Sequence, residues 1–524
     1  MTKQRKAERK PLSFSTTMRN PDRISGFLNC ILPFEGQILT NDIIHEVALQ
    51  LIMKKYYYTE KYEMKIPEYK AIYKDDDATF TRAQVEDIIQ NSPQNHKEAG
   101  FEHGWPSRFD TWYKLPMEFG FISYAMNEPI KISQTGHMLI DAYNEVPAND
   151  KKVQNVMLNA MMKYQSNNPF RRNANSNVPL LLLLNVLKLL KADEEENGAG
   201  LFKQELSLLI CWPNSDYNAL YRRIKALRKT VNYTYSDEYM YDICFKLLEA
   251  DESKRNRFKM NQICGEAVDE YIRKMRSTGI ISLRGNGRFI DFNTLEQEKI
   301  DYVIENYSRF NTFEDTASYY QYMGCIDNKI LDIQQTVKID LSDIRKQTLY
   351  KYAEEYSQDK IFEELQRVCM KKDSKDPILK FINAPTRLEF LTSIALVQGF
   401  TGLDVNPNYS VDDEGLPTFT AGGGSADIEC YDSDCDSLFE VTLMCGKQDQ
   451  VMNEIIPIRR HLLEHKAIKE NSFSVFIAPV VHIDTKEAAS WYKYKENLDI
   501  ITLNITEFIS KVRTSERVAC FLMA

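Results

Sequence analysis

Two carboxylates that flank an acidic turn have the residue types and spacing needed for metal-dependent chemistry. The segment SADIECYDSDCDSLFEVTL spans residues 425–443, and from Thr401 to Glu440 the chain has ten Asp and Glu and no Lys or Arg. We expect two strands joined by the turn DSDCD, with Asp427 at the start of the first strand and Glu440 inside the second. Because paired strands lie side by side, both carboxylates would converge on one point.

An all-oxygen site at this point suits Mg²⁺. Side chains alternate along a strand, so Glu440 and Thr442 face one side and Val441 faces the other. The backbone carbonyl of Val441 joins the carboxylates of Asp427 and Glu440 as a third oxygen ligand. A magnesium ion polarises a phosphodiester and lowers the pKa of its bound water, which generates the attacking hydroxide. The pattern therefore predicts hydrolysis of phosphodiester bonds.

The sequence of the acidic turn excludes a calcium loop. The run from Asp432 to Asp436 begins like an EF-hand, but Ser437 stands where that loop needs glycine and Leu443 where it needs glutamate. A solvated loop is the preferred explanation for the three aspartates of the turn: Asp432, Asp434 and Asp436.

Glu440 needs a different explanation, because its neighbours predict a mostly buried strand. These neighbours are Leu438, Phe439, Val441 and Leu443. A buried carboxylate is costly unless it is paired or liganded. A buried ion pair with a lysine is the alternative to a metal ligand.

The chain after Pro377 alternates between helix and strand patterns. The expected order is an amphipathic helix PTRLEFLTSIALVQGF, the acidic hairpin, a helix PIRRHLLEHKAI, a buried strand SFSVFIAP, a helix EAASWYKYKEN, a strand DIITLN and a helix ITEFISKV. Such alternation implies an α/β domain whose sheet is covered by helices on both faces.

Two segments of the N-terminal half have the pattern of a helix followed by a hairpin. Segment 107–135 ends its helix near Phe119 and continues with the strands FISY and IKIS. Segment 263–294 ends its helix at Gly279 and continues with IISL, the turn RGNG and RFIDF. This is the outline of a winged helix, which places a helix in the DNA major groove and a hairpin on the backbone. An ordinary α+β domain explains either copy equally well.

Cations are concentrated between these two patterns. Residues 220–290 carry fifteen Lys and Arg against nine Asp and Glu, although the net charge of the chain is −9. Local charge matters more to DNA binding than the total. Four arginines are candidates for a phosphate-facing surface: Arg222, Arg223, Arg284 and Arg288. A solvated helix face explains any one of them as well.

The composition is that of an ordinary globular protein, with 43% hydrophobic and 27% charged residues among 524. The basic N-terminus lacks the apolar core of a secretory signal. The apolar stretch 178–190 is too short to span a bilayer and predicts a buried helix. The ten cysteines are scattered without a CxxC pair, which favours reduced thiols in a cytosolic protein over structural zinc.

The acidic hairpin resembles a known nuclease core. Asp427, twelve intervening residues and Glu440-Val441-Thr442 are similar to the PD-(D/E)xK core of type IIS restriction endonucleases of the AlwI family and of the large subunits of related heterodimeric nicking enzymes. Three further segments resemble that family: RNPDRISGFLNCILPFEGQ (19–37), residues 178–212 and SVFIAP (474–479).

The resemblance implies a set of site residues. Asp427 and Glu440 match the two metal ligands, and Val441 contributes its backbone carbonyl. Glu389, in LEFL, matches a carboxylate from the preceding helix. Glu454 matches a fourth carboxylate, although one residue fewer separates it from Glu440 than in the family.

Two positions depart from the wider superfamily or take a secondary role. Thr442 occupies the position of the superfamily lysine, so Lys447 or a second metal ion would have to replace that charge. His461 aligns with a family histidine, for which a structural or phosphate-contacting role is favoured over that of a base.

The sequence thus predicts a multidomain protein with a mostly helical, winged-helix-like N-terminal half and a C-terminal α/β PD-(D/E)xK nuclease core. The expected parts are recognition subdomains at 1–150 and 151–300, a helical linker at 301–375 and a cleavage domain at 376–524. Arg108, in the first winged-helix-like unit, is a further candidate for DNA contact.

The expected function is that of a cytoplasmic prokaryotic restriction endonuclease. It would bind double-stranded DNA and use Mg²⁺ to cut or nick at a fixed offset from an asymmetric sequence, alone, as a transient homodimer or with a second nuclease subunit. No membrane partner is expected. A repair or junction-resolving nuclease on the same core, and a DNA-binding regulator with an inert C-terminal domain, are the alternatives.

Overall fold

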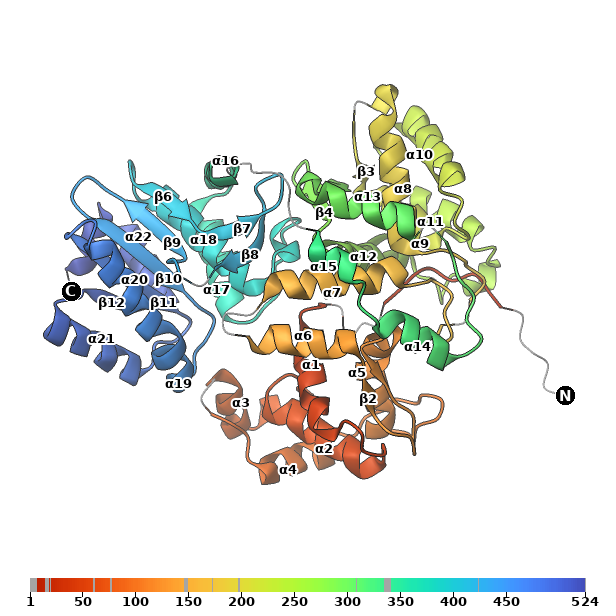
Figure 1. The fold of residues 1–524 in the computed structure, drawn as a ribbon, viewed down its shortest axis with the longest axis horizontal. Helices are drawn as coiled ribbons and strands as arrows, with labels where there is room; N and C mark the ends of the chain where they lie inside the picture. Colours follow the sequence, from red (N-terminus) through yellow and green to blue (C-terminus); the bar gives the residue numbers. More distant parts are fainter. Residues whose placement is uncertain are drawn as a thin grey trace. The chain divides into compact units, whose positions relative to one another are not determined.

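The chain forms two compact units in a computed structural model (Figure 1). Unit 1 comprises Met1–Tyr62 and Thr81–Val337, and unit 2 comprises Glu63–Phe80 and Lys338–Ala524. The model describes residues 7–14, 18, 20–59, 62–75, 78–145, 149–171, 173–196, 198–307, 309–333, 341–422 and 424–523. The basic start of the chain, residues 1–6, and Arg19 lie outside the described residues. The expected linker 301–375 contributes to both units rather than forming one of its own.

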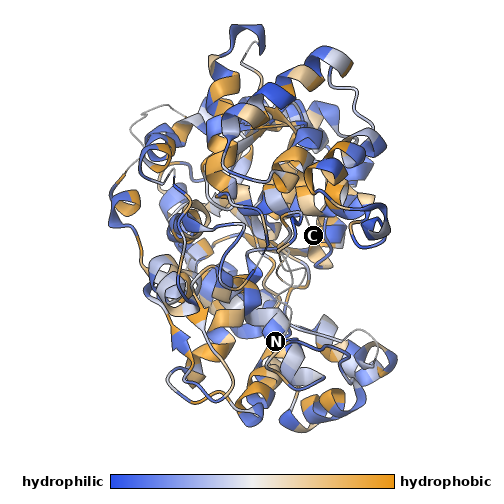
Figure 2. Cartoon of the chain, turned by 90° about the vertical axis from the view of Figure 1, so that its right-hand side faces the viewer, coloured by the Kyte–Doolittle hydropathy of each residue, from blue (hydrophilic) through white to orange (hydrophobic). Residues whose placement is uncertain are grey.

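Unit 1 is mostly helical, as predicted. Hydrophobic and hydrophilic residues alternate along most of the helices in Figure 2, as expected when each helix buries one side. The helices are α1 (Arg23–Ile31), α2 (Asn41–Met53), α4 (Arg82–Asn91), α5 (Trp105–Glu118), α6 (Gln134–Asn144), α7 (Asp150–Lys163), α8 (Pro179–Ala192), α9 (Leu206–Cys211), α10 (Tyr217–Val231), α11 (Asp237–Leu247), α12 (Ala267–Arg276), α13 (Gln297–Asn306), α14 (Thr316–Gly324) and α15 (Asn328–Asp332).

Short polar side chains begin many of these helices. The side chains of Thr40, Ser133, Asn149, Asp216 and Ser236 each accept a hydrogen bond from a backbone N–H of the first turn. Such caps satisfy donors that have no partner inside the helix. The apolar stretch 178–190 is the buried helix α8, as predicted. Among the described residues, no helix is long and apolar enough to cross a membrane.

Both predicted combinations of a helix and a hairpin are present in unit 1. Helix α5 is followed by the antiparallel strands β1 (Ile122–Ser123) and β2 (Lys131–Ile132). Helix α12 is followed by β4 (Ile281–Arg284) and β5 (Phe289–Phe292), which are also antiparallel. A third strand that the sequence did not reveal, β3 (Leu201–Phe202), pairs with β5, and the sheet order is β3-β5-β4.

The helix of each combination is a core helix. Every residue of α5 and of α12 is buried or partly buried, and none is exposed. A helix without an exposed face has no side chains to offer to a DNA groove. The expectation that these two helices present a side to DNA is therefore not met.

Unit 2 contains a five-stranded mixed sheet of order β12-β11-β10-β9-β6. Strand β9 pairs antiparallel with both β6 and β10, whereas β10, β11 and β12 run parallel. The seven residues of β11 are all buried, as expected for a strand between two parallel neighbours. The strands are β6 (Asp404–Pro407), β9 (Ile428–Tyr431), β10 (Asp436–Val441), β11 (Ser472–Ala478) and β12 (Ile500–Asn504), with a separate hairpin of β7 (Tyr409–Val411) and β8 (Pro417–Ala421).

Helices cover both faces of this sheet, as predicted. Leu438 and Phe476 on one face belong to a buried cluster with residues of α20 and α21. Phe439, on the opposite face, packs its ring against Phe508 of α22 and Phe521. The helices of unit 2 are α3 (Pro67–Lys74), α16 (Leu341–Glu355), α17 (Gln358–Cys369), α18 (Ala384–Gly399), α19 (Lys447–Asp449), α20 (Ile456–Lys466), α21 (Ile483–Glu496) and α22 (Ile505–Thr514).

Helix α18 differs from its sequence-based description. The sequence predicts an amphipathic helix, but every residue from Thr386 to Leu396 is buried. The reason is that α16 and α17 pack on it in addition to β6 and β8. Residues 341–369, expected as part of a linker, therefore help to enclose the core of unit 2.

Gly120 provides a test of the packing in unit 1. Its φ is +75°, and an added Cβ would lie 2.3 Å from the Cβ of Met323. Gly100 has a similar φ of +87° but nothing within 4 Å of the added atom. We expect Gly120→Ala to lower the free energy of unfolding by about 3 kcal/mol and Gly100→Ala by about 1 kcal/mol, because only the first adds a collision to the backbone strain. Denaturant titration of both variants measures the difference, and equal losses would contradict the packing of α14 against Gly120.

Candidate active site

The two carboxylates singled out by the sequence lie across from each other on paired strands. The antiparallel ladder of β9 and β10 ends at the pair Ile428 and Phe439. Asp427 and Glu440 are the next residues outward on the two strands, so they are placed to face the same side. The backbone N–H of Val441 donates to Asp427 Oδ2 over 2.7 Å, which ties the two ends together.

Glu440 is buried, as predicted, with 6% of its surface exposed. Its Oε1 lies 2.9 Å from Nδ1 of His461, which comes from α20. The partner is therefore a histidine and not the lysine that the sequence left as an alternative. Burial and the charge of Arg460 lower the pKa of His461.

Glu454 joins this pair from the turn that precedes α20. Burial raises the pKa of Glu454 to about 8, the charge of Asp427 adds to the rise, and a hydrogen bond with the side chain of Thr442 opposes it. Thr442, at the position of the superfamily lysine, therefore supports a neighbouring carboxylate. The spacing irregularity noted for Glu454 does not keep it away from Asp427.

Asp427, Glu440 and Glu454 form an acidic cluster. Burial and mutual repulsion raise the pKa values of all three carboxyl groups. Burial and then the charge of Glu440 raise the pKa of Asp427 well above its ordinary value, although the Val441 N–H lowers it. Burial and then Glu454 raise the pKa of Glu440 in the same way. Such a cluster favours protons or a cation. In the described part of the chain, no group of three or more His, Cys, Asp or Glu side chains is arranged to hold a metal ion, so a shared ion would rest on fewer side chains.

Glu389 is buried in α18, with 2% of its surface exposed. Its Oε2 accepts a hydrogen bond of 3.1 Å from the backbone N–H of Ala421, at the end of β8. The carboxylate thus connects α18 to the segment that leads into β9.

Lys447, one candidate to replace the superfamily lysine, pairs with Asp484 at 2.5 Å. Its side chain is 56% exposed. This pairing connects the start of α19 to the start of α21 and favours a structural role for Lys447.

The acidic turn is not uniformly solvated. Asp436 is buried and pairs with Lys469 at 2.7 Å and with His465 at 3.1 Å, so the solvated-loop explanation is wrong for this residue. Asp432 and Asp434 both pair with Arg517. The turn is therefore held by cations from later in the chain, which the local sequence does not contain.

A comparison with models of protein families identifies the family of this chain. The model of the AlwI restriction endonuclease family matches residues 117–340 and 325–510. The chain belongs to the AlwI restriction endonuclease family. It is therefore a site-specific deoxyribonuclease whose substrate is DNA.

Solved restriction endonucleases are among the similar structures. The small subunit (R.BspD6I2) of the heterodimeric restriction endonuclease R.BspD6I is 22% identical, with a TM-score of 0.25, over 29% of this chain and 76% of that chain. The restriction endonuclease FokI is 12% identical, with a TM-score of 0.24, over 97% of this chain and 95% of that chain. FokI bound to DNA is 13% identical, with a TM-score of 0.23 and the same coverage. TM-scores this low do not establish a common fold. No curated protein matches the chain.

The five arginines expected to contact DNA in this AlwI-family enzyme fall into two groups. Arg108 lies 2.8 Å from His96 and stacks on the rings of Tyr57 and Trp112. Arg284 pairs with buried Asp291 at 2.8 Å and also donates to a backbone carbonyl. These two guanidinium groups are engaged in packing.

The other three arginines are exposed: Arg222, Arg223 and Arg288. Among the described residues, the guanidinium of Arg288 donates only to the carbonyl of Gly285, within its own turn. The side chains of Arg222 and Arg223 make no hydrogen bond or ion pair within this part of the chain. These three remain open to an external anion.

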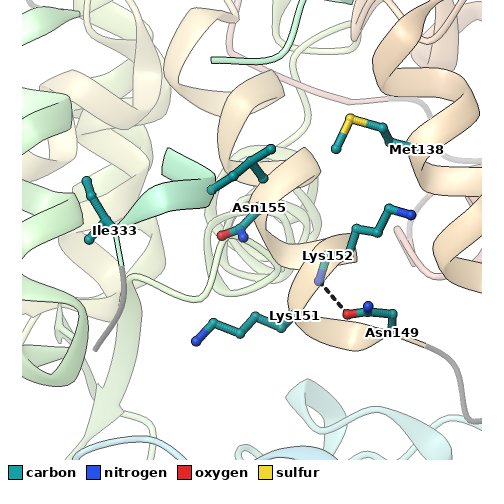
Figure 3. A pocket seen from close by; sticks show the side chains of 7 residues that line it. Met138, Asn149, Lys151, Lys152, Asn155 and Ile333 are labelled. Atoms are coloured by element: carbon teal, nitrogen blue, oxygen red, sulfur yellow. Dashed lines mark hydrogen bonds between the residues drawn. The ribbon is translucent and has the colours of Figure 1, made fainter. Parts of the chain in front are cut away.

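A cavity of about 560 Å³ lies in unit 1 and contains none of the predicted site residues. It is lined by side chains of α6, α7 and α15 and by Ile333 (Figure 3). Lys152, on its rim, pairs with Glu145 at 3.2 Å. The acidic cluster, by contrast, belongs to unit 2.

The shifted carboxyl group of Glu454 gives the metal-free protein a predictable pH dependence. The unfolded chain releases this proton near pH 4.5 and the folded chain near pH 8. The folded state therefore holds the extra proton between these values, and its stability falls as the pH rises through that window. Because glutamine does not titrate, the Glu454→Gln variant should not lose this stability as the pH rises.

Thermal unfolding in EDTA tests this expectation. We expect the variant to be more stable than the parent by at least about 1 kcal/mol at pH 8, with little difference at pH 4.5. Glu487→Gln, an exposed acid on α21, should show no such trend. A Glu454→Gln advantage that is constant with pH would show that Glu454 is not protonated in the folded state.

Proposed function

We propose that this AlwI-family enzyme uses Mg²⁺ to hydrolyse one phosphodiester bond at a fixed offset from an asymmetric sequence. The observation that carries the proposal is the placement of Asp427 and Glu440 at the open ends of paired strands, tied by the Val441 N–H. Two carboxylates and a nearby backbone carbonyl are an oxygen donor set of the kind that Mg²⁺ takes together with water and substrate phosphate.

The chemistry of the site fits a divalent cation. Burial raises the pKa values of Asp427, Glu440 and Glu454, and the charge of a neighbouring carboxylate in the cluster adds to each rise. In the proposed site Asp427, Glu440 and the carbonyl of Val441 hold the ion. A bound Mg²⁺ supplies charge neutralisation at the phosphate and a water of lowered pKa.

Protein groups keep the proposed ligands in position. The N–H of Val441 holds one oxygen of Asp427, and Nδ1 of His461 holds one oxygen of Glu440. The backbone N–H of Asp427 also forms a hydrogen bond with Glu440. Glu454, supported by Thr442, is placed to hold or pass a proton near this pair, and Glu389 fixes the segment before β9.

The parts of the chain take separate tasks in this proposal. Residues 376–524 form the PD-(D/E)xK cleavage domain, enclosed by the helices of residues 301–375 that belong to unit 2. Residues 1–150 and 151–300 are the recognition subdomains, the second of them winged-helix-like. An acidic cleavage surface binds DNA poorly by itself, so exposed arginines elsewhere must supply the affinity.

Separation of the two tasks supports cleavage at an offset. The exposed arginines Arg222, Arg223 and Arg288 belong to unit 1, whereas the acidic cluster belongs to unit 2. A single acidic cluster cuts a single strand. A second copy of the chain, or a second nuclease subunit, is therefore required for a double-strand break, and the chain alone nicks.

Cleavage of plasmid DNA tests the proposal. We expect the wild-type protein with Mg²⁺ to give discrete ends at a fixed distance from one short word, and Asp427→Asn or Glu440→Gln to reduce the rate by at least about 10³-fold because the charge that holds the ion is lost. Glu487→Gln serves as the matched control and should keep the full rate.

The other outcomes identify the alternatives. Cutting that follows DNA structure and not sequence would indicate a repair or junction-resolving nuclease. Binding without any cutting would indicate a regulator with an inert C-terminal unit. Full activity in both Asp427→Asn and Glu440→Gln would refute the site.

Binding of Mg²⁺ provides a test that does not depend on activity. We expect Mg²⁺ to raise the melting temperature of the wild-type protein at pH 8, since the ion relieves repulsion only in the folded state. Asp427→Asn should lose most of that increase, whereas Glu487→Gln should keep it. An equal increase in all three proteins would place the binding of Mg²⁺ elsewhere.

A further inference from the structure

Helix α10 presents an exposed polar face, on which Lys229 pairs with Glu195 at 3.3 Å. It packs on α8 through a buried side formed by Leu220, Ile224, Leu227 and Arg228. The opposite side is exposed and consists of Asn218, Arg222, Arg223, Ala226, Lys229 and Thr230. The small Ala226 in this row leaves its neighbours free to approach a flat or concave partner.

The cations of α10 differ in what they contact. Lys225 pairs with Glu195 at 3.0 Å, and Arg228 pairs with Glu205 and Glu196 at 2.7 Å each. These bridges fasten the second half of the helix to the segment between α8 and α9.

In the part of the chain that the structure describes, the first half of α10 makes no ion pair, although the hydroxyl of Tyr221 donates to Asp193. Asn218, Arg222 and Arg223 make no side-chain hydrogen bond or ion pair within the described part of the chain. A rigid helix that carries unpaired arginines on one side is suited to an anionic partner outside the chain.

The surroundings of α10 match a helix-turn-helix with a wing. Helix α9 precedes α10 with only residues 212–216 between them, and the side chain of Asp216 caps α10. Strand β3 precedes α9 and joins the β4–β5 hairpin as the third strand of one sheet. The buried helices α5 and α12 cannot take the groove-reading position, whereas α10 can.

The turn of the β4–β5 hairpin lies beside the C-terminal end of α10. The ring of Phe289 contacts both Phe202 and Tyr233, which follows α10 directly, with centroids 5.3 and 5.6 Å apart. Arg228 also stacks on Tyr233. The exposed Arg288 is therefore carried next to α10 by a packed aromatic group.

We propose that α10 is the recognition helix, that Asn218 and Arg222 read base edges in the major groove, and that Arg223 and Arg288 hold the phosphates on either side. The inference deepens the site-specific DNA binding of the family and rests on it. Arg284 and Arg108 are excluded from this role by their internal partners.

Arg222 and Asn218 match different bases, so the inference predicts a specific base for each residue. The planar guanidinium of arginine matches the O6 and N7 acceptors of guanine, and the amide of asparagine matches the N6 and N7 positions of adenine. Residues four apart on a helix lie about 6 Å apart along its axis. Base pairs rise about 3.4 Å each, so the adenine and the guanine lie within about two base pairs of each other.

Selection from a randomised duplex library tests the inference with the full chain. The parent is Asp427→Asn, which binds without cutting, and the readout is the base preference at each position together with the affinity. In this parent, Arg222→Ala should reduce preference for one guanine by about 5- to 150-fold. Asn218→Ala should reduce preference for an adenine within two base pairs of it.

Two matched variants separate reading from simple charge. Arg223→Ala should weaken binding to all sequences alike and lower the slope of log affinity against log salt by about one. Lys188→Ala removes an exposed cation from neighbouring α8 and should change no base preference. A guanine preference that survives in Arg222→Ala, or an adenine preference that survives in Asn218→Ala, would overturn the inference.

Failure of the cleavage proposal has a different signature. A wild-type protein that selects a word without cutting it would refute the proposed hydrolysis and leave α10 as the recognition helix. A protein that cuts at a word whose preferences do not respond to Asn218 or Arg222 would refute only the recognition helix.

Discussion

The placement of Asp427 and Glu440 across the ends of β9 and β10 is the constraint on which the rest of the account depends. Ladder hydrogen bonds fix the register up to Ile428 and Phe439, and the Val441 N–H continues it by donating to the side chain of Asp427. Backbone geometry, and not a flexible loop, therefore sets the separation of the two carboxylates. The parallel pairing of β10 with the fully buried β11 keeps this hairpin rigid.

Electrostatics divides the protein into complementary parts. Burial and mutual repulsion make the acidic cluster unfavourable for DNA, and in the proposed function a bound cation offsets that repulsion. Unit 1 retains exposed arginines at α10 and at the β4–β5 turn, while most neighbouring cations are neutralised internally. In the proposed function, binding and cutting therefore depend on different charges in different units, as cleavage beside the recognition sequence would require.

Local sequence was sufficient for much of the fold. The order of strands and helices after residue 377 followed from apolar runs bounded by turn residues, and both N-terminal hairpins appeared where Gly120 and Gly279 end a helix. Strand β3 has only two residues, too few to show a periodic pattern. The sequence also could not show which helices are exposed. Helices α5, α12 and α18 are enclosed by elements distant in sequence, whereas α10 is exposed on one side.

The candidate site shows the same division between local and distant information. Glu440 was recognisable because a carboxylate among apolar neighbours needs a partner, but that partner, His461, lies 21 residues further along the chain, in helix α20. Asp436 was expected to be solvated because its partners, His465 and Lys469, lie about 30 residues further along the chain, near the end of α20. The arginines illustrate the limit best, since Arg108 and Arg284 were indistinguishable by sequence from Arg222 until their partners were seen.

Anomalous scattering from crystals soaked in Mn²⁺, which takes the same oxygen ligands as Mg²⁺, tests the central claim most directly. The account predicts one peak in unit 2 within bonding distance of the carboxylates of both Asp427 and Glu440 and of the backbone carbonyl of Val441. A peak that contacts only one of the two carboxylates, or one bound elsewhere while these side chains remain unliganded, would contradict it.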